Sequence, residues 1–402
     1  MSSKPDYDET LATHAGRRSL ENHGVVNPPV YRASTILFPT IDAFDARWEN
    51  RFQKGNVIYG LCGTPTTFAL EDAMTALEGG YGCVVLPSGM AAVAMAILAF
   101  VRGGDHLLMV DAVYEPTRKF CDNFLAGIGV ETTYYDPLIG EGIEALIRPN
   151  TRVVYLESPG SLTFEVQDVP AIARASHGRG VRVLMDNTWA TPLYFKPFEH
   201  GVDVSIHAGT KYISGHSDIM SGLVTVTEEF YEPMRRTVFG FGQCAGADDT
   251  YAVLRGLRTM PARLSQQSEQ AMEIAKWLKN RPEVGRVLHP ALPDCPGHEH
   301  WRRDYLGASS LFGFTLRNND RNAVSSFIDG MRLFGIGASW GGYESLLIPA
   351  YPESLRTATK WPNDEFLVRI HVGLEHKDDL IADLEQGFER MRSISSTESA
   401  PG

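Results

Sequence analysis

The chain has 402 residues, of which 43% are hydrophobic and 21% charged, enough for about two or three globular domains with a substantial core. A formal net charge of −12 argues against sequence-independent binding to phosphate backbones or anionic membranes, although small anions can still bind locally. The most apolar run, residues 90–101, is too short for a bilayer, and the N-terminus lacks the apolar core of a secretory signal. Five scattered cysteines without a C-x-x-C pair indicate a reduced, cytoplasmic chain with no metal site.

Residues 1–63 form the first of three predicted regions. They are rich in Pro, Asn, Gly and charged residues and contain only brief apolar stretches. Such a segment cannot bury a core of its own. We therefore expect an N-terminal arm that lies on a neighbouring subunit or on the main body.

Residues 64–257 alternate between helical and strand patterns, which predicts an α/β domain. The apolar run 90–101 reads as a buried helix that ends at a Gly-Gly pair. Short runs rich in Val, Ile and Leu read as strands at 83–86, 106–111, 151–158, 181–187, 202–208 and 222–227. Strands of this kind with helices between them indicate a mostly parallel sheet that is covered on both faces.

Residues 258–402 predict a smaller α+β domain. An amphipathic helix is expected over 265–284, strands over 311–318 and 366–373, and a closing helix over 380–393. The polar tail from 393 to 402 is expected to be disordered.

Polar residues stand at the ends of three predicted strands of the α/β domain. Ser88 and Gly89 follow the first strand, Asp186 ends another, and Thr210 and Lys211 follow a third. Ligands bind outside the carboxyl ends of the strands in open α/β sheets. The three strand ends therefore predict one binding site.

Each of these groups also has an ordinary structural interpretation. Ser88 and Gly89 at a helix N-terminus favour a phosphate, but Ser there is also a common N-cap. Asp186 after an apolar run suggests a cationic partner, such as a ring nitrogen, or else a cap on the following loop. Lys211 in a dry pocket would have a lowered pKa and act as a nucleophile, whereas a loop lysine can simply reach solvent. Together they match what pyridoxal phosphate needs for its phosphate, its ring nitrogen and its aldehyde.

Arg369 lies within an otherwise apolar strand, LVRIHVGLE. A guanidinium there is costly unless it meets a carboxylate. That carboxylate is either an acidic side chain in a buried ion pair or the α-carboxylate of an amino-acid substrate.

The sequence resembles the pyridoxal-phosphate enzymes of cysteine and methionine metabolism, and within them the bacterial cystathionine β-lyases. The likeness runs from about residue 13 to 391 and is carried by motifs in the family's order: YEPTRKFCDNFL, VVYLESPGS, MDNTWATP, TKYISGHSD, RGLRT, LHPALP, SWGGYESL and RIHVGLE. It implies the fold of the type I PLP-dependent transferases, with a seven-stranded, mostly parallel sheet. It also implies a homotetramer, built as a dimer of dimers with shared active sites, in the transsulfuration steps of methionine biosynthesis.

The resemblance implies a role for each matching residue. Lys211, Asp186 and Tyr114 would be catalytic: Lys211 bonds the cofactor aldehyde and later removes the α-proton, Asp186 holds the ring nitrogen protonated, and Tyr114 stacks on the ring. The other implied cofactor-binding residues are Tyr59, Ser88, Gly89, Met90 and Thr210. The implied substrate-binding residues are Tyr59, reaching in from a neighbouring subunit, and Asn187, Ser339, Trp340 and Arg369.

The implied reaction is β-elimination, which cleaves L-cystathionine to homocysteine, pyruvate and ammonia. A broader cysteine-S-conjugate lyase or cysteine desulfhydrase is the nearest alternative. A γ-lyase or γ-synthase is a more distant one, and a non-catalytic protein on this fold is a third.

The arm departs from the family pattern at one position. The family has Tyr-Gly-Arg where this chain reads YGLC, so Leu61 replaces an arginine that contacts the phosphate. We expect either Arg51 or Lys54 to replace that cation, or the site to tolerate its loss. The adjacent Cys62 is best interpreted as a packing residue.

Two further departures fall in the distal substrate pocket. Ala338 stands where β-lyases have an aromatic residue and several γ-acting relatives have Glu, and Phe239 replaces a tyrosine. Trp340 is retained. The absence of Glu argues against the γ-acting branch, and the smaller pocket leaves the far end of the substrate open.

Overall fold

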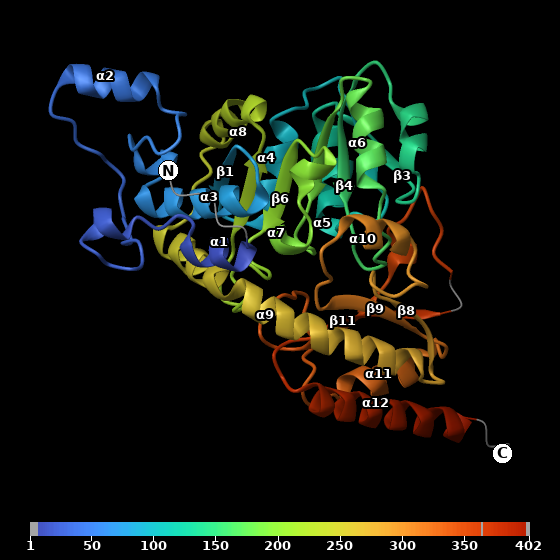
Figure 1. Ribbon diagram of the computed structural model, residues 1–402. Coiled ribbons are helices and arrows are strands. Elements are labelled where there is room, and N and C mark those ends of the chain that lie inside the picture. The colour runs from blue at the N-terminus through green and yellow to red at the C-terminus, as the bar shows by residue number, and fades with distance from the viewer. Residues whose placement is uncertain (1–6, 363–364, 399–402) are drawn as a thin grey trace.

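A seven-stranded sheet forms the centre of the protein in the computed structural model, which describes residues 7–362 and 365–398. Its strands are β1 (Gly82–Leu86), β2 (His106–Val110), β3 (Glu131–Tyr135), β4 (Thr151–Glu157), β5 (Arg182–Asp186), β6 (Val204–Ala208) and β7 (Gly222–Val226). They lie in the order β1-β7-β6-β5-β4-β2-β3. Figure 1 shows β1, β6, β4 and β3 of this sheet from left to right. Strand β7 is antiparallel to both β1 and β6, and the other neighbours are parallel. The expected mostly parallel sheet is confirmed.

Apolar side chains bury the sheet on both faces, as the continuous Val, Ile and Leu runs predict. The helices of this domain are α3 (Pro65–Glu78), α4 (Gly89–Leu98), α5 (Glu115–Lys119), α6 (Val169–His177), α7 (Thr191–Tyr194) and α8 (Glu228–Gly240). Helix α4, the predicted buried helix, packs on β6 and β7, and α3 packs on β1 and β7. Strand β3, ETTYY, is the one strand of this sheet that the apolar pattern misses, because it is a partly exposed edge strand.

A second, four-stranded antiparallel sheet forms the C-terminal domain. It has the order β10-β11-β9-β8, with β8 (Val284–Leu288), β9 (Leu311–Leu316), β10 (Leu346–Ala350) and β11 (Phe366–His371). The remaining helices are α10 (His298–Asp304), α11 (Arg321–Asp329) and α12 (Lys377–Glu398). The expected α+β unit and its strands β9 and β11 are confirmed. Helix α12 continues to residue 398, into the tail expected to be disordered, and 399–402 lie outside the described residues.

One helix of 33 residues, α9 (Ala247–Lys279), connects the two sheets. It contacts α3 in the first domain and both β8 and α12 in the second, and in Figure 1 it runs diagonally below the large sheet and above α11 and α12. The predicted boundary at residue 257 therefore falls inside a continuous helix. None of the helices in the described residues is long and apolar enough to cross a membrane.

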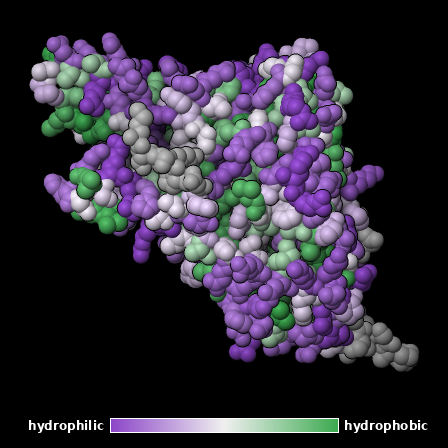
Figure 2. Space-filling model, viewed as in Figure 1, coloured by the Kyte–Doolittle hydropathy of each residue, from purple (hydrophilic) through white to green (hydrophobic). Residues whose placement is uncertain are grey.

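The N-terminal arm divides into two parts. Helix α1 (Asp8–His14) packs on its own chain, where Leu11 and Ala12 are buried and Arg258 donates hydrogen bonds to the Ala12 and Ala15 carbonyls at 2.7 Å. Beyond it, the chain still contacts the body where the Tyr31 N–H donates to the Thr66 Oγ1 at 2.8 Å. Farther along, α2 (Ile41–Glu49) projects without a buried residue (Figure 1). Figure 2 shows apolar side chains gathered on this projecting part.

Short helical turns complete the fold: η1 (Ser19–Asn22), η2 (Gly60–Cys62), η3 (Phe120–Leu125), η4 (Gly140–Leu146), η5 (Pro197–His200) and η6 (Pro352–Ser354).

Candidate active site

A cavity of about 210 Å³ opens where the carboxyl ends of the central strands face the C-terminal domain. Its lining brings together all three predicted strand ends and residues of the second domain. The sequence-predicted residues that line it are Ser88, Gly89, Met90, Tyr114, Asp186, Thr210, Lys211, Trp340 and Arg369. The structure thus assembles in one place groups that are up to about 280 positions apart in the chain, consistent with the rule for open α/β sheets.

Asp186 is the last residue of β5, where the buried strand reaches the cavity. Its Oδ1 accepts a hydrogen bond from the Thr188 backbone N–H at 2.9 Å. Burial raises the pKa of this carboxyl, while Thr188 and the nearby side chains of His207 and Lys211 oppose the shift. A carboxylate held in this way is well suited to a cationic partner inside the cavity.

Lys211 follows β6 in a turn and points its amine into the same cavity. Its Nζ donates to the Ser339 Oγ at 2.7 Å and lies 5.2 Å from the centre of the Trp340 ring. Burial, assisted by the Arg369 cation and opposed by Asp186, lowers the pKa of Lys211 to about 8. A substantial fraction of the amine is therefore neutral and nucleophilic near pH 7.5.

The N-terminus of α4 forms the anion-binding end of the cavity. Ser88 is the N-cap residue, with its Oγ accepting from the Ala91 N–H at 3.1 Å, so its predicted capping role is present. The Gly89 and Met90 N–H groups belong to the first turn and have no partner within the helix. A Cβ on Gly89 would lie 2.7 Å from the Ala208 side chain, so glycine permits this close packing. Ser88 therefore caps the helix, as the structural interpretation predicts, and the free N–H groups next to it can bind an anion, as the functional interpretation requires.

Arg369 extends from β11 toward the cavity, and its Nη2 donates to the Ala338 and Ser339 carbonyls at 3.1 and 3.0 Å. No carboxylate lies within ion-pair distance of it among the residues that the structure describes. The described residues therefore do not give Arg369 the structural ion pair that was the alternative interpretation. Burial lowers the pKa of Arg369 to about 10, and the guanidinium remains a cation open to an anionic ligand.

Tyr114 stands just before α5 with its ring half-exposed at the cavity. Its backbone N–H donates to the Glu157 Oε2 at 2.8 Å. Glu157, the last residue of β4, also lines the cavity and was not predicted. Sequence reasoning missed it because a strand-end Glu alone carries no distinguishing signal. What distinguishes it is its register with Asp186 on the neighbouring strand, and that register is visible only in the assembled sheet.

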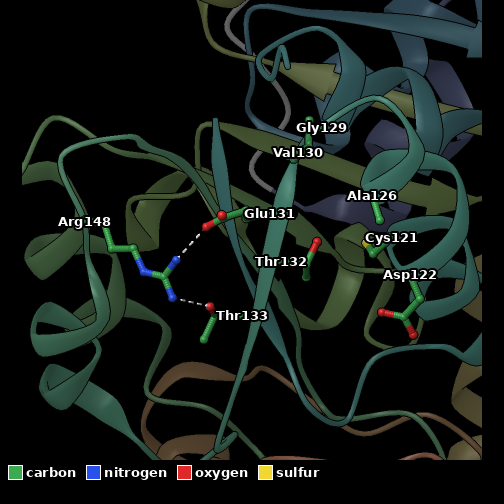
Figure 3. A pocket seen from close by; sticks show the side chains of 9 residues that line it. All are labelled: Cys121, Asp122, Ala126, Gly129, Val130, Glu131, Thr132, Thr133 and Arg148. Carbon is green, nitrogen blue, oxygen red and sulfur yellow. Dashed lines mark hydrogen bonds and ion pairs between the residues drawn. The ribbon is translucent and has the colours of Figure 1, made fainter. Parts of the chain in front are cut away.

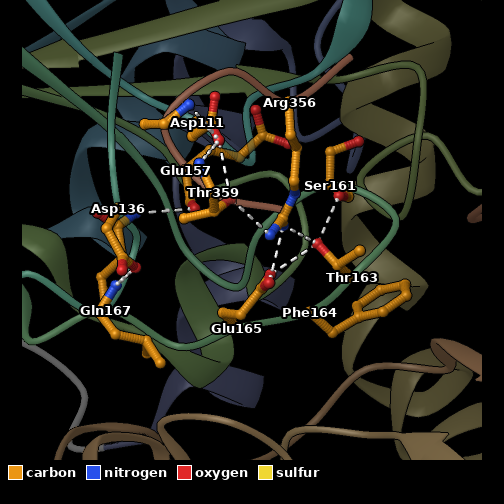
Figure 4. Close-up of polar contacts among 12 residues, drawn as sticks. Asp111, Asp136, Glu157, Ser161, Thr163, Phe164, Glu165, Gln167, Arg356 and Thr359 are labelled. Carbon is orange, nitrogen blue, oxygen red and sulfur yellow. Dashed lines mark hydrogen bonds and ion pairs between the residues drawn. The ribbon is translucent and has the colours of Figure 1, made fainter. Parts of the chain in front are cut away.

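A loop of the C-terminal domain, residues 352–361, is fastened beside the cavity by two buried carboxylates (Figure 4). Asp111 accepts from the Thr359 N–H at 2.8 Å and from the Arg118 Nη2 at 2.6 Å. Glu165 forms a buried ion pair with Arg356 at 2.8 Å. Glu165 immediately follows the 159–164 segment, several of whose residues line the cavity. These bonds fix one wall of the cavity.

Some predicted residues do not reach the cavity within one chain. Asn187 is fully buried and its Nδ2 donates to the Phe195 carbonyl at 3.2 Å, away from the cavity, because successive strand residues point to opposite faces. Its predicted substrate contact does not occur in this geometry. Ser339 lies beside the cavity through its bond to Lys211, whereas Tyr59 and Phe239 lie elsewhere. Tyr59 is 41% exposed on the arm, and the Phe239 ring packs against Phe52 at 5.8 Å.

The two cations expected to replace the arginine at position 61 are engaged within their own chain. Arg51 donates to the Trp48 carbonyl at 3.0 Å, and Lys54 donates to the Tyr81 carbonyl and lies over the Tyr81 ring. Neither lines the cavity. Their predicted contact with a phosphate stays a prediction for an assembled oligomer.

A second hollow, of about 550 Å³, lies at the edge strand β3 (Figure 3). Its one cation, among the residues that line it, is Arg148, which is bound to Glu131 at 2.8 Å and to Thr133 at 3.1 Å. Burial raises the pKa of Cys121 there to about 12, so its thiol stays protonated. This hollow lacks the convergent free charges of the first cavity.

Comparison with known proteins identifies the class. Residues 9–389 match the model of the Cys/Met metabolism PLP-dependent enzyme family, and the chain belongs to that family. It is 45% identical to a cystathionine beta-lyase of Haemophilus influenzae, over 97% of this chain and all of that protein. It is 46% identical to the cystathionine beta-lyase of Salmonella typhimurium, over 95% of this chain and 98% of that protein.

Other members of the family are also similar. A protein of Wolbachia pipientis named L-alanine/L-glutamate racemase is 37% identical over 97% of this chain and 98% of that protein. Among solved structures, metB from Corynebacterium glutamicum superimposes with a TM-score of 0.88 at 30% identity, covering 97% of this chain and 99% of that chain. The type I fold expected from the sequence is confirmed.

The cofactor of this family is pyridoxal phosphate, and the residues of the cavity fit it. A helix N-terminus with a hydroxyl at Ser88 suits the phosphate, a carboxylate at Asp186 suits the ring nitrogen, and an amine at Lys211 suits the aldehyde. The unpaired Arg369 adds a place for the carboxylate of an amino acid.

Proposed function

We propose that this chain is a PLP-dependent carbon–sulfur β-lyase that converts L-cystathionine and water to L-homocysteine, pyruvate and ammonia. The observation that carries the proposal is the convergence of Lys211, Asp186 and Arg369 on one cavity, in a chain that belongs to this family. Each group has a distinct task, and together they account for a substrate that carries an amine, an α-carboxylate and a leaving group at Cβ.

In the proposed mechanism, pyridoxal phosphate supplies a ring that accepts electrons and an aldehyde that bonds amines. Gly89, Met90, Ser88 and Thr210 hold its phosphate, Asp186 holds the ring nitrogen, and Tyr114 covers the ring. Arg369 binds the substrate α-carboxylate and thereby orients the Cα–H bond toward Lys211.

Lys211 moves the proton. Burial and the Arg369 cation lower the pKa of its Nζ to about 8, and the neutral form of this amine accepts the α-proton as general base. Ser339, 2.7 Å from Nζ, orients the amine through its hydroxyl oxygen. The resulting ammonium is then close to Asp186, whose carboxylate favours the charged amine. The thiolate leaves from Cβ, and the same ammonium is placed to return a proton.

A second candidate substrate class is supported by one observation. Ala338 lines the cavity with only a methyl group, so this wall leaves more room than a larger side chain would, contrary to the smaller pocket expected from the sequence. Cysteine S-conjugates with bulkier or less polar S-substituents can be accommodated there, so a broader cysteine-S-conjugate β-lyase is the alternative that this wall supports.

The assembly belongs to the proposal as well. We infer a homotetramer, a dimer of dimers, in which the projecting arm of one subunit supplies Tyr59 to the site of another. The exposed apolar side chains of the arm support this, since a face of that kind is normally covered. A reducing, cytoplasmic location is supported by five cysteines that are all free thiols.

A substrate panel tests the function. Purified enzyme with added cofactor is given cystathionine, cystine, cysteine and S-alkyl cysteines, and both pyruvate and thiol are measured. The proposal expects the highest kcat/KM for cystathionine, with pyruvate and homocysteine in equal amounts. Release of 2-oxobutanoate instead would contradict β-elimination. The absence of any absorbance from bound cofactor would contradict the proposal that the protein is a PLP-dependent enzyme.

A further inference from the structure

Glu157 and Asp186 form a pair of neighbouring carboxyl groups in the cavity. They are register partners in the parallel pair β4 and β5, and each is the last residue of its strand. Neighbouring strands are about 4.8 Å apart, and residues in register point to the same face. Both side chains line the cavity. Two carboxylates this close in a dry site cannot both be ionised without a large cost, so the pair retains a proton.

The surroundings of the two groups are unequal. Asp186 accepts the Thr188 N–H, and the side chains of His207 and Lys211 favour its ionised form. Glu157 accepts the Tyr114 N–H, while burial and the Asp186 charge raise its pKa well above the ordinary value.

The cations of the cavity are also distributed unequally. Lys211 acts on the pKa of Asp186, and Arg369 acts on that of Tyr114. Among the described residues, no cation forms an ion pair with Glu157. The negative charge therefore settles on Asp186 and the proton on Glu157.

We propose that Glu157 is a positioning residue that keeps the shared proton of this carboxyl pair, anchors Tyr114 as a neutral acid, and leaves the single charge on Asp186. The inference rests on the proposed function, since Tyr114 and Asp186 are its cofactor-contacting residues. It assigns to Glu157 the task of holding one wall of the cofactor site without competing with Asp186 for the ring nitrogen.

A neutral carboxylic acid and an amide have almost the same shape, so substitution of Glu157 by glutamine tests the role of its proton. Glu157→Gln keeps an oxygen for the Tyr114 N–H and removes only the ionisable proton. Glu157→Met keeps the length of the side chain and removes the acceptor. Glu165→Gln is the matched control, because Glu165 is a buried carboxylate of the same region that is ion-paired with Arg356 at 2.8 Å.

The variants are compared as holoenzymes in three measurements. Infrared difference spectra report protonated carboxyl groups through their carbonyl stretch, fluorescence titration gives the cofactor dissociation constant, and the absorbance of the bound cofactor is followed against pH. Calorimetry shows whether each variant is folded.

The expected result separates the variants. Glu157→Gln loses a protonated-carboxyl band that wild type and Glu165→Gln retain, and its cofactor affinity and pH titration match wild type within about twofold. Glu157→Met weakens cofactor binding by about 3- to 10-fold, as expected for one lost hydrogen bond. Glu165→Gln lowers the melting temperature.

Three outcomes would overturn the inference. A protonated band unchanged in Glu157→Gln shows that the proton is not there. A cofactor affinity or pH titration as altered in Glu157→Gln as in Glu157→Met shows that the charge is required. A folded Glu157→Met that binds cofactor like wild type shows that Glu157 positions nothing. None of these readouts involves cleavage of a thioether, so a lyase assay that fails while they succeed contradicts the proposed function alone.

Discussion

The cavity and the N-terminal arm differ in how far one chain completes them. At the cavity, groups from both domains converge, and Asp186 and Lys211 have hydrogen-bond partners within the chain. On the arm, Leu20, Leu37 and Ile41 are 96%, 89% and 78% exposed. Apolar surface of that kind is stable only when something covers it. The difference teaches that one chain by itself brings Lys211, Asp186 and Arg369 together, whereas Tyr59 on the arm can act at such a site only in the proposed assembly.

The largest expected effect falls on the cavity. Lys211→Ala removes the base, and we expect pyruvate release from cystathionine to fall by at least about 10³-fold. Lys119→Ala, an exposed lysine that is ion-paired with Glu115, is the control and should keep full activity. A Lys211→Ala variant with more than a few per cent of wild-type activity would assign the base to another residue.

Arg369→Leu is expected to lower kcat/KM by about 100-fold, mostly through KM, because the substrate carboxylate loses its charge-assisted hydrogen bonds. Arg369→Lys should recover only part of this loss, since an ammonium cannot reproduce the guanidinium fork. Steady-state kinetics on cystathionine check both variants. Equal KM values in wild type and Arg369→Leu would show that the carboxylate binds elsewhere.

The arm is tested by subunit complementation. Tyr59→Ala and Lys211→Ala should each be strongly impaired as pure proteins. In mixed dimers, one site combines the intact Lys211 of one chain with the intact Tyr59 of the other, so reassociation should restore about a quarter of wild-type activity. A mixture that stays inactive, despite mixed oligomers seen by native mass spectrometry, would place Tyr59 in its own subunit's site or in none.

The distal wall is expected to show a smaller effect. Ala338→Phe should lower kcat/KM for bulky S-conjugates by about 10-fold while changing that for cysteine by less than about threefold, because only the former extend to the enlarged side chain. The ratio of the two kcat/KM values is the measurement. An unchanged ratio would show that Ala338 does not set specificity.

The smallest effect is a pH dependence. Because the pKa of Lys211 is lowered to about 8, the neutral amine that reacts with the cofactor aldehyde increases as pH rises toward 8 and saturates above it. The rate at which cofactor-free enzyme captures pyridoxal phosphate should follow this curve in stopped-flow absorbance. A rate that keeps rising toward pH 10 would indicate an ordinary, solvated lysine.

Sequence patterns predicted most of the fold because its strands are buried on both faces. Continuous runs such as that of β5 cannot be mistaken for surface segments. At the ends of three of them, β1, β5 and β6, polar residues were expected at one binding site, and these residues line the cavity. The edge strand β3 and the short strands β8 and β10 were not predicted, since partly exposed or mixed strands lack that pattern.

Site residues that directly follow a strand could be predicted from the sequence. Residues whose place in the site depends on the direction of the side chain were harder to predict. Asn187 adjoins Asp186 in sequence but points to the opposite face. Glu157 was missed because its proposed role depends on its register with Asp186, which only the assembled sheet reveals. Arg369 was recognised because a lone cation in an apolar strand is costly.

Helix α9 and the loop at Arg356 both join the two domains, one by a continuous backbone and the other by a buried ion pair. A hinge motion between the two sheets would have to bend helix α9 and break the ion pair of Arg356 with Glu165. The spacing between the amine on one domain and the guanidinium on the other is thereby fixed before any ligand arrives. Under the proposed function, a substrate has to match this fixed spacing with its amine and its α-carboxylate.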